Sequence, residues 1–421
     1  MLTALYSIFW KNSVEIRRIF QEKKEGSGEI SRLYPFVSSP GPALLLSCHN
    51  SLSLLLCQAL HPLFFPFCSQ PLFWVVQIFF SWYNKLLFRT GEVFVFIGNV
   101  EITTPLALAP MAGVTDLAFR TICRRLGAGY TVSEMVSAKA LCYQDKKTLP
   151  LLELGEGEHP AAVQLFGCEE EDMEKAAAKA AEYSGADIID INMGCPVPKV
   201  CNNGEGSGLA RDPEKAAKIA AAVVRGAGGR PVTAKIRLGW DKGHLNYLEL
   251  AKRLEGAGVS AVAVHGRTKV QMYSGKADWS AIREVKETLS IPVIANGDVF
   301  SSQDAVAILK HTGADMVMIG RGAFGNPWLF QQCAAALRGE PIPPRPSLAQ
   351  RCDTVVEQIR LAAEQKGERI ACLEARKHYA WYLKGIPYAG YYKEQICKVE
   401  TLEQVDEITK GIKRDLKDPE E

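Results

Sequence analysis

The stretch VTAKIRLGWDKGHLNYLELAKRLEGAGVSAVAVH, residues 232–265, carries the pattern that decides the fold. It begins with a short, largely apolar run, Val232–Arg237, and continues through an amphipathic segment with helical spacing, Tyr247–Ala257. It ends in a second apolar run, Ala261–His265. A strand, a helix and a second strand in this order predict a βαβ unit, whose two strands lie parallel in one sheet.

The same unit recurs between Phe96 and Phe330. Eight strands are predicted, at Ile102–Met111, Tyr130–Met135, Ala161–Phe166, Asp187–Asn192, Val232–Arg237, Ala261–His265, Pro292–Ala295 and Met316–Ile319. Amphipathic segments such as Glu171–Ser184 and Pro213–Arg225 lie between them. Eight units in about 230 residues favour a closed (β/α)8 TIM barrel. An open doubly wound sheet is the alternative, but no GxGxxG turn follows the first strand.

Polar or glycine-rich residues stand at the end of every predicted strand. They are Met111-Ala112-Gly113, Glu134-Met135, Gln164, Asn192 and Cys195, Lys235 and Arg237, His265 and Arg267, Asn296-Gly297-Asp298, and Gly320-Arg321-Gly322. Barrel enzymes place their chemistry at the carboxyl ends of the strands. We therefore expect these residues to outline one site.

Composition sets broad limits on the function. Lysines and arginines number 49 and acidic residues 47, so any surface for a polyanion must be a local patch. The 12 cysteines are scattered, without a CxxC pair or a Cys/His spacing that suits zinc, and we expect no metal. Scattered cysteines in an enzyme-sized chain are typical of a reduced, cytoplasmic protein.

Residues 1–92 differ in kind from the rest. No Asp, Glu, Lys or Arg occurs from Leu33 to Asn84, yet the best apolar window, Pro71–Asn84, falls short of the ~20 residues that span a bilayer. We predict an apolar extension that is not a folded domain, with a membrane-associating segment as the alternative. The barrel domain is then expected at residues 93–340.

A small helical domain is predicted at residues 345–417. The proline-rich stretch 341–346 (PIPPRP) is typical of a linker, and helical periodicity follows at Ser347–Gln365, Leu373–Leu383 and Glu403–Lys417. Between positions 376 and 398 the only acid is Glu394, and the basic residues are Arg376, Lys377, Lys384, Lys393 and Lys398. Tyrosines and a tryptophan are interleaved with them, a composition typical of nucleic-acid surfaces. A solvated helix with a buried aromatic face is the alternative.

Two glycine-rich turns, Asn296-Gly297-Asp298 and Gly320-Arg321-Gly322, indicate a phosphate site. The loops after strands seven and eight of a TIM barrel commonly hold a phosphate, and Arg321 can add a bidentate contact to it. A phosphate here, with a ring over the barrel mouth, suggests flavin mononucleotide (FMN). Lys235 lies inside an apolar run, where a cation can face the negative charge of a reduced flavin, and Gln164 can bind the same edge. Ordinary turns and a solvent-reaching lysine are the alternatives.

Cys195 is the strongest candidate for acid or nucleophilic chemistry. It lies on the glycine-flanked loop Asn192-Met193-Gly194-Cys195-Pro196, beyond strand four. A thiol over the barrel mouth can act as a general acid or a nucleophile. Cys201, in the same loop, is the rival.

At this point the chain resembles a known family. The segments that carry the resemblance are APMAGVTDLAFR (109–120), VSEM (132–135), VQLFG (163–167), DINMGCPVPKV (190–200), KIRLGW (235–240), VHGRT (264–268), QMYSGKADW (271–279), ANGDVF (295–300), GRGAFGNPW (320–328) and RKHYAWYLKG (376–385). They are similar to those of tRNA-dihydrouridine synthases, most of all the bacterial B type, over residues 96 to 415.

The resemblance implies a role for individual residues. FMN is expected to bind to Pro110, Met111, Ala112, Gln164, Lys235, His265, Asn296, Gly297, Asp298, Gly320 and Arg321. Cys195 is implied as the catalytic acid and Asn192 as a neighbour of the target uracil. The helical domain resembles the family's tRNA-binding module, which places Arg376, Lys377, Lys384 and Lys393 on the tRNA.

The implied reaction has two steps. NADPH or NADH reduces FMN, which passes a hydride to C6 of a uridine drawn out of the tRNA fold, and the cysteine protonates C5. We expect a monomer without a membrane partner. The alternatives are an FMN-dependent barrel that acts on a free pyrimidine, of the dihydroorotate or dihydropyrimidine dehydrogenase type, and a non-catalytic RNA-binding barrel.

Overall fold

The computed structural model describes residues 94–143, 145 and 148–418, all of which belong to one compact unit. The apolar extension predicted for residues 1–92 lies outside the described residues. Within the described part of the chain, no helix is long and apolar enough to cross a membrane.

Eight parallel strands close into a barrel in the order β10-β3-β4-β5-β6-β7-β8-β9. Their bounds are β3 Leu106–Leu108, β4 Tyr130–Ser137, β5 Ala161–Phe166, β6 Ile188–Met193, β7 Val232–Arg237, β8 Ala261–His265, β9 Val293–Asn296 and β10 Met316–Ile319. The strands are buried on both faces, which is why they appear in the sequence as apolar runs rather than as an alternating pattern. The predicted TIM barrel is confirmed, and the open sheet is excluded.

The first predicted strand is wrong in part. Instead of one strand at Ile102–Met111, β1 (Val95–Ile97) and β2 (Val100–Ile102) form an antiparallel hairpin, and the barrel begins only at β3. Pro105 explains the break, because proline has no N–H for a strand ladder. Pro110 likewise follows the end of β3.

The hairpin closes the amino-terminal end of the barrel. Val95, Ile97 and Ile102 are buried in one apolar cluster with residues of seven barrel strands, among them Tyr130 of β4 and Ile188 of β6. The barrel therefore has a covered bottom, and its site must be sought at the opposite end.

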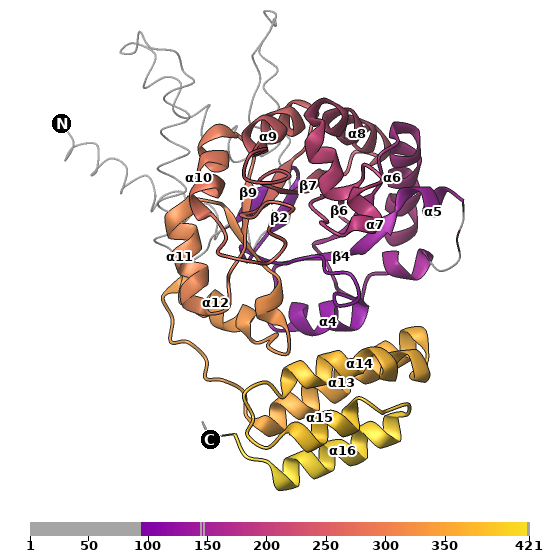
Figure 1. Cartoon of the computed structure of the whole chain (residues 1–421), viewed down its shortest axis with the longest axis vertical. Coiled ribbons are helices and arrows are strands. Elements are labelled where there is room, and N and C mark those ends of the chain that lie inside the picture. The colour runs from indigo at the N-terminus through magenta and orange to yellow at the C-terminus, as the bar shows by residue number, and fades with distance from the viewer. Residues whose placement is uncertain (1–93, 144, 146–147, 419–421) are drawn as a thin grey trace, which may run out of the picture. The chain divides into compact units, whose positions relative to one another are not determined.

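Helices surround the barrel (Figure 1). They are α4 Leu117–Arg125, α5 Ala138–Cys142, α6 Glu170–Ser184, α7 Pro198–Cys201, α8 Pro213–Gly226, α9 Tyr247–Gly256, α10 Trp279–Thr288, α11 Ser302–Thr312 and α12 Leu329–Arg338, with 3-10 turns η1 Leu149–Leu152, η2 Gly206–Arg211 and η3 Arg321–Ala323. Helix α8 shows how the sequence sets an end: Asp212 accepts a hydrogen bond from the N–H of Lys215, and Pro213 occupies the first helical position.

Four further helices follow the barrel: α13 Leu348–Lys366, α14 Glu368–Tyr382, α15 Gly390–Ile396 and α16 Leu402–Asp415. They share an apolar core of their own, distinct from that of the barrel. Helix α14 begins five residues before the predicted Leu373, and the short helix α15 was not predicted. A seven-residue helix that starts at Gly390 has too few turns to show a period.

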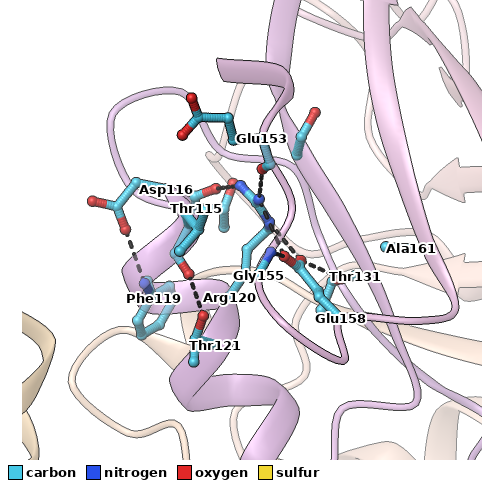
Figure 2. A network of polar contacts seen from close by, with 12 residues as sticks. Thr115, Asp116, Phe119, Arg120, Thr121, Thr131, Glu153, Gly155, Glu158 and Ala161 are labelled. Atoms are coloured by element: carbon cyan, nitrogen blue, oxygen red, sulfur yellow. Dashed lines mark hydrogen bonds and ion pairs between the residues drawn. The ribbon is translucent and has the colours of Figure 1, made fainter. Parts of the chain in front are cut away.

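A buried ion pair fixes the loop between β3 and α4 (Figure 2). Arg120 Nε lies 2.6 Å from Glu158 Oε1, and both side chains are 2% exposed. The same guanidinium donates to the carbonyls of Thr115 at 3.0 Å and Glu153 at 2.6 Å, and Glu158 also accepts from the Thr131 hydroxyl at 2.7 Å. Arg120 thus ties the β3–α4 loop, whose first residues reach the barrel mouth, to the segment before β5.

Candidate active site

A cavity of about 330 Å³ opens at the carboxyl ends of the strands. It is lined by the thirteen barrel residues assigned to the flavin, the uracil or catalysis: Pro110, Met111, Ala112, Gln164, Asn192, Cys195, Lys235, His265, Asn296, Gly297, Asp298, Gly320 and Arg321. Of the other strand-end residues expected to outline the site, Gly113, Glu134 and Arg267 do not line the cavity. Its volume is in the range of small-molecule and cofactor sites. A second hollow of about 750 Å³, at the starts of α6 and α8, is lined mainly by acidic side chains and contains none of them.

The loop that carries Cys195 is held by its neighbours. Asn192 Oδ1 accepts hydrogen bonds from the N–H of Cys195 at 2.9 Å and of Gly194 at 3.2 Å. On the other side, the Ser207 hydroxyl donates to the carbonyl of Cys195 at 2.8 Å. The thiol is therefore carried by a fixed backbone at the edge of the cavity.

The two candidate cysteines differ in environment. Burial raises the pKa of the Cys195 thiol, an effect only partly offset by the Val197 N–H and the Arg237 charge, so the group is a protonated thiol at neutral pH. A protonated thiol suits a proton donor better than a nucleophile. Cys201 is buried in α7, with its Sγ 3.6 Å from the Pro196 carbonyl oxygen, and does not line the cavity.

A chain of buried hydrogen bonds runs beneath the cavity. Asp190, on β6, accepts from the Thr233 hydroxyl at 2.5 Å and from Gln164 Nε2 at 2.6 Å. Gln164 Oε1 in turn accepts from Asn192 Nδ2 at 2.8 Å. Burial raises the pKa of Asp190, while these donors and the Lys235 charge lower it. The chain links a buried carboxyl group to the residue that holds the Cys195 loop.

Two cations of β7 face the cavity. Burial, aided by the Arg237 charge and opposed by Asp190, lowers the pKa of Lys235 to about 8. Burial also lowers the pKa of Arg237 to about 10, and its guanidinium donates to the carbonyls of Gly194 at 2.8 Å and Met272 at 2.9 Å. Arg237 thus joins the Cys195 loop to the loop after β8.

A second polar chain follows β8 and β9. Arg267 Nη2 lies 2.8 Å from both carboxylate oxygens of Asp298, and Arg321 Nη2 lies 3.5 Å from the same carboxylate. Arg267 also donates to His265 Nε2 at 3.3 Å, since a guanidinium can only donate. Burial and the surrounding cations strongly lower the pKa of His265, so its ring is neutral with the proton on Nδ1. The Asp298 carboxylate thus binds Arg267 and Arg321, so an anion in this part of the cavity would contact the backbone of Asp298 and not its side chain.

The glycine turns allow close backbone contacts. Gly297 has φ +131°, and a Cβ there would lie 2.7 Å from the Ala277 side chain. A Cβ at Gly322 would lie 2.1 Å from the Val299 carbonyl oxygen. Arg321 lies between these turns, with Cζ 4.5 Å from the centre of the Tyr273 ring and 5.6 Å from that of Phe300.

The four predicted RNA contacts differ in accessibility. Lys384 is exposed, whereas Lys377 and Lys393 are half-buried. Lys377 Nζ lies 3.2 Å from the place that a Cβ of Gly113 would occupy, at the lip of the cavity. Arg376 is half-buried and donates to the Val399 carbonyl at 2.9 Å, so it also helps to hold the four C-terminal helices together.

The interleaved aromatic residues divide into two groups. Tyr379, Tyr382 and Tyr392 are buried in the core of the four helices, as the alternative interpretation expected. Tyr388 and Tyr391 are 93% and 66% exposed and stay available for a partner.

Two of the four C-terminal helices, α13 and α14, contact residues at the rim of the cavity. Trp381 of α14 stacks on Phe324, which lines the cavity, with ring centres 4.2 Å apart and planes 12° apart. A Cβ at Gly325 would lie 2.3 Å from the Trp381 carbonyl carbon, so only glycine fits there. Lys366 of α13 also pairs with Asp116 of the β3–α4 loop at 2.7 Å.

Four functional candidates were given no role from sequence: Asp190, Arg237, Arg267 and Tyr273. Asp190 stands two residues before Asn192, and the period of two along a strand could have placed both on the inner face. Arg237 and Arg267 stand at strand ends, but nothing local tells that their guanidinium groups bridge loops. Nothing local in the sequence predicts a role for Tyr273. The structure shows it as an exposed residue that lines the cavity.

Comparison with known proteins gives one consistent result. A family model described as "Dihydrouridine synthase (Dus)" matches residues 107–417. A "Probable tRNA-dihydrouridine synthase" of Rickettsia conorii is 44% identical over 298 residues, which cover 70% of this chain and 89% of that protein. The "tRNA-dihydrouridine synthase B" of Pasteurella multocida is 44% identical over 290 residues, which cover 69% of this chain and 87% of that protein. Among solved structures, the old yellow enzyme homologue from Zymomonas mobilis aligns with a TM-score of 0.44 and 15% identity, over 59% of this chain and 93% of that one.

Proposed function

Because the chain belongs to the dihydrouridine synthase family, we propose that it reduces specific uridines of tRNA to 5,6-dihydrouridine at the barrel cavity. It is a flavin-dependent oxidoreductase, and we take FMN as the flavin and NADPH or NADH as the reductant. The observation that carries the proposal is the meeting of a protonated thiol, Cys195, with Lys235, Arg237 and Arg321 around one cavity at the carboxyl ends of the strands.

The cavity residues fit FMN in charge and in shape. Three cations line it, and the lining carboxylate of Asp298 is already paired with Arg267, so the cavity favours an anion. The Gly297 and Gly320 turns with Arg321 suit the phosphate. Lys235 suits the negative charge of the reduced ring. Gln164 suits the polar ring edge, and residues 110–112 would form a close wall beside the ring.

The chain's own residues account for the proton that the reaction needs. When bound, the flavin supplies the hydride that adds to C6 of the uracil. Cys195 then gives its thiol proton to C5, completing the addition of two hydrogens across the double bond. Asn192 would lie against the uracil, and its hydrogen bond from the N–H of Cys195 supports a fixed distance between the thiol and the base.

The uracil can reach this cavity only after leaving the RNA stack. We propose that Lys377, Lys384 and Lys393 contact tRNA phosphates, and that the exposed rings of Tyr388 and Tyr391 offer stacking surfaces. Arg376 supports this surface from within. The nicotinamide reductant would use the same mouth, and the reaction would take place in the cytoplasm, where tRNA is found.

The test is a reaction with purified full-length protein, NADPH and tRNA transcribed in vitro, which carries no modification. We expect dihydrouridine, detected by mass spectrometry of nucleosides, and none with Cys195→Ala. A parallel reaction with free uridine or uracil separates the alternatives. Reduction of the free pyrimidine but not of tRNA would replace this proposal with the free-pyrimidine oxidoreductase.

A further inference from the structure

The buried carboxylate of Asp190 has no part in the reaction as described above. It is 4% exposed and lies inside the barrel, on the strand that leads to Asn192 and Cys195. Register places it opposite Thr233 on β7 and Gln164 on β5. A buried carboxylate is costly unless donors and a cation surround it, which calls for an account of what it does.

The hydrogen bonds around Asp190 have a fixed direction. An ionised carboxylate can only accept, so Gln164 must turn its Nε2 toward Asp190, at 2.6 Å. Its Oε1 then faces Asn192 and accepts from Nδ2 at 2.8 Å. Asn192 is left with Oδ1 toward the loop, where it accepts from the N–H of Cys195. The orientation of both amides thus follows from the carboxylate.

The charge of Asp190 acts on Lys235. The two residues lie on adjacent strands, with Asn192 opposite Lys235 and Asp190 one inward-facing position below. Burial moves both groups toward their neutral forms, and each opposes that shift in the other. The other groups that act on the Lys235 ammonium are Arg237 and the thiol of Cys195, and His265 lies close by as a neutral ring. Asp190 is therefore the carboxylate that favours the charged ammonium.

We propose that Asp190 is a positioning residue that sets the direction of the Gln164–Asn192–Cys195 chain and keeps Lys235 protonated in the working site. Burial raises the pKa of Asp190, and the hydrogen bonds from Thr233 and Gln164 together with the Lys235 charge favour its ionised form. One buried anion would thus prepare both partners of the reaction, the cation beside the flavin and the loop of the proton donor. The inference rests on the proposed function only in naming the reaction that Asp190 would assist.

The charge is tested with Asp190→Asn in flavin-free, full-length protein. Loss of a neighbouring carboxylate lowers a lysine pKa by about one unit. From a value of about 8 in the wild type, the neutral fraction of Lys235 at pH 7 would then rise about fivefold. We expect an amine reagent to modify Lys235 about fivefold faster, measured by peptide mass spectrometry. Asp187→Asn, the same change one residue before β6, is the matched control and should leave the rate of Lys235 modification unchanged.

The direction of the chain is tested by the alkylation rate of Cys195. Asp190→Asn can keep the chain, because an amide oxygen still accepts from Gln164, so we expect a rate within about twofold of the wild type. Asp190→Leu and Gln164→Met break the chain at different points and should both alkylate several-fold faster. Unchanged rates in these two variants, or unchanged modification of Lys235 in Asp190→Asn, would overturn the proposal.

Lys235→Met tests the pair if the Asp190 variants do not fold. Without the ammonium the pKa of Asp190 rises further above its unfolded value, so the stability that its protonated form gives is lost as pH rises. The melting temperature of Lys235→Met should therefore fall more steeply than that of the wild type from pH 5 to pH 7, below the pKa of Lys235 itself, and parallel curves would refute the coupling. All these readouts need neither flavin nor RNA, so a failure of the proposed reaction would not be mistaken for a failure of this inference.

Discussion

Replacing Arg120 by methionine should destabilise the barrel strongly and loosen one wall of the cavity. The change removes the ion pair with Glu158, and both side chains are 2% exposed, so solvent screening is slight. It also leaves the carbonyls of Thr115 and Glu153 without their guanidinium donor. Removing one member of a buried pair costs about 3–5 kcal/mol, because the remaining charge is desolvated and uncompensated. We expect a loss of this size at pH 7.

The assay is urea unfolding followed by circular dichroism, with three variants compared. Glu158→Met alone should cost a similar amount, since it leaves the Arg120 cation buried. The double variant should cost clearly less than the sum, because neither charge remains. Flavin affinity should fall in Arg120→Met, since the β3–α4 loop loses its anchor. Additive costs, or a cost below about 1 kcal/mol for Arg120→Met, would refute the idea that this pair holds the loop.

Four further outcomes are expected. Cys195→Ala should retain flavin and accept electrons from NADPH without forming dihydrouridine, whereas Cys201→Ala, which alters a thiol away from the cavity, should turn over normally. Turnover should fall as pH rises through about 8, because Lys235 loses its charge there, and a flat rate from pH 7 to 9 would count against its role. Arg321→Ala should release flavin more readily on dialysis, read from the absorbance of the protein fraction. Lys384→Ala should lower the salt slope of tRNA binding by about one unit, with flavin reduction by NADPH unchanged.

The strands of the barrel could be predicted because of where they lie. A strand such as β8 is covered on both faces, so each of its residues must be apolar or engaged, and the run stands out in the sequence. The prediction of one strand at Ile102–Met111 was wrong in part, because a mostly apolar stretch hides a break between two strands. Residues 102–111 are apolar apart from Thr103 and Thr104, and these threonines with Pro105 separate the hairpin from β3.

The candidate site was predictable as a set of positions but not as a network. Strand ends and glycine turns indicated which residues meet, since parallel strands bring their carboxyl ends together. The partners of each group depend on side chains distant in sequence, as in the bond from Arg237 to Met272, 35 residues away. The split of the C-terminal tyrosines was equally hidden, because Tyr388 and Tyr392 have the same composition around them yet opposite burial.

The hairpin of β1 and β2 has a consequence for the order of events during turnover. Because it covers the amino-terminal end of the barrel with buried apolar side chains, reactants enter the cavity from the carboxyl ends of the strands. In the proposed reaction two bulky reactants share this entrance and must bind in turn, so the nicotinamide has to leave before the uridine can enter. The reduced flavin would then hold the electrons between the binding of the reductant and the binding of the tRNA. An excess of either reactant would slow the binding of the other.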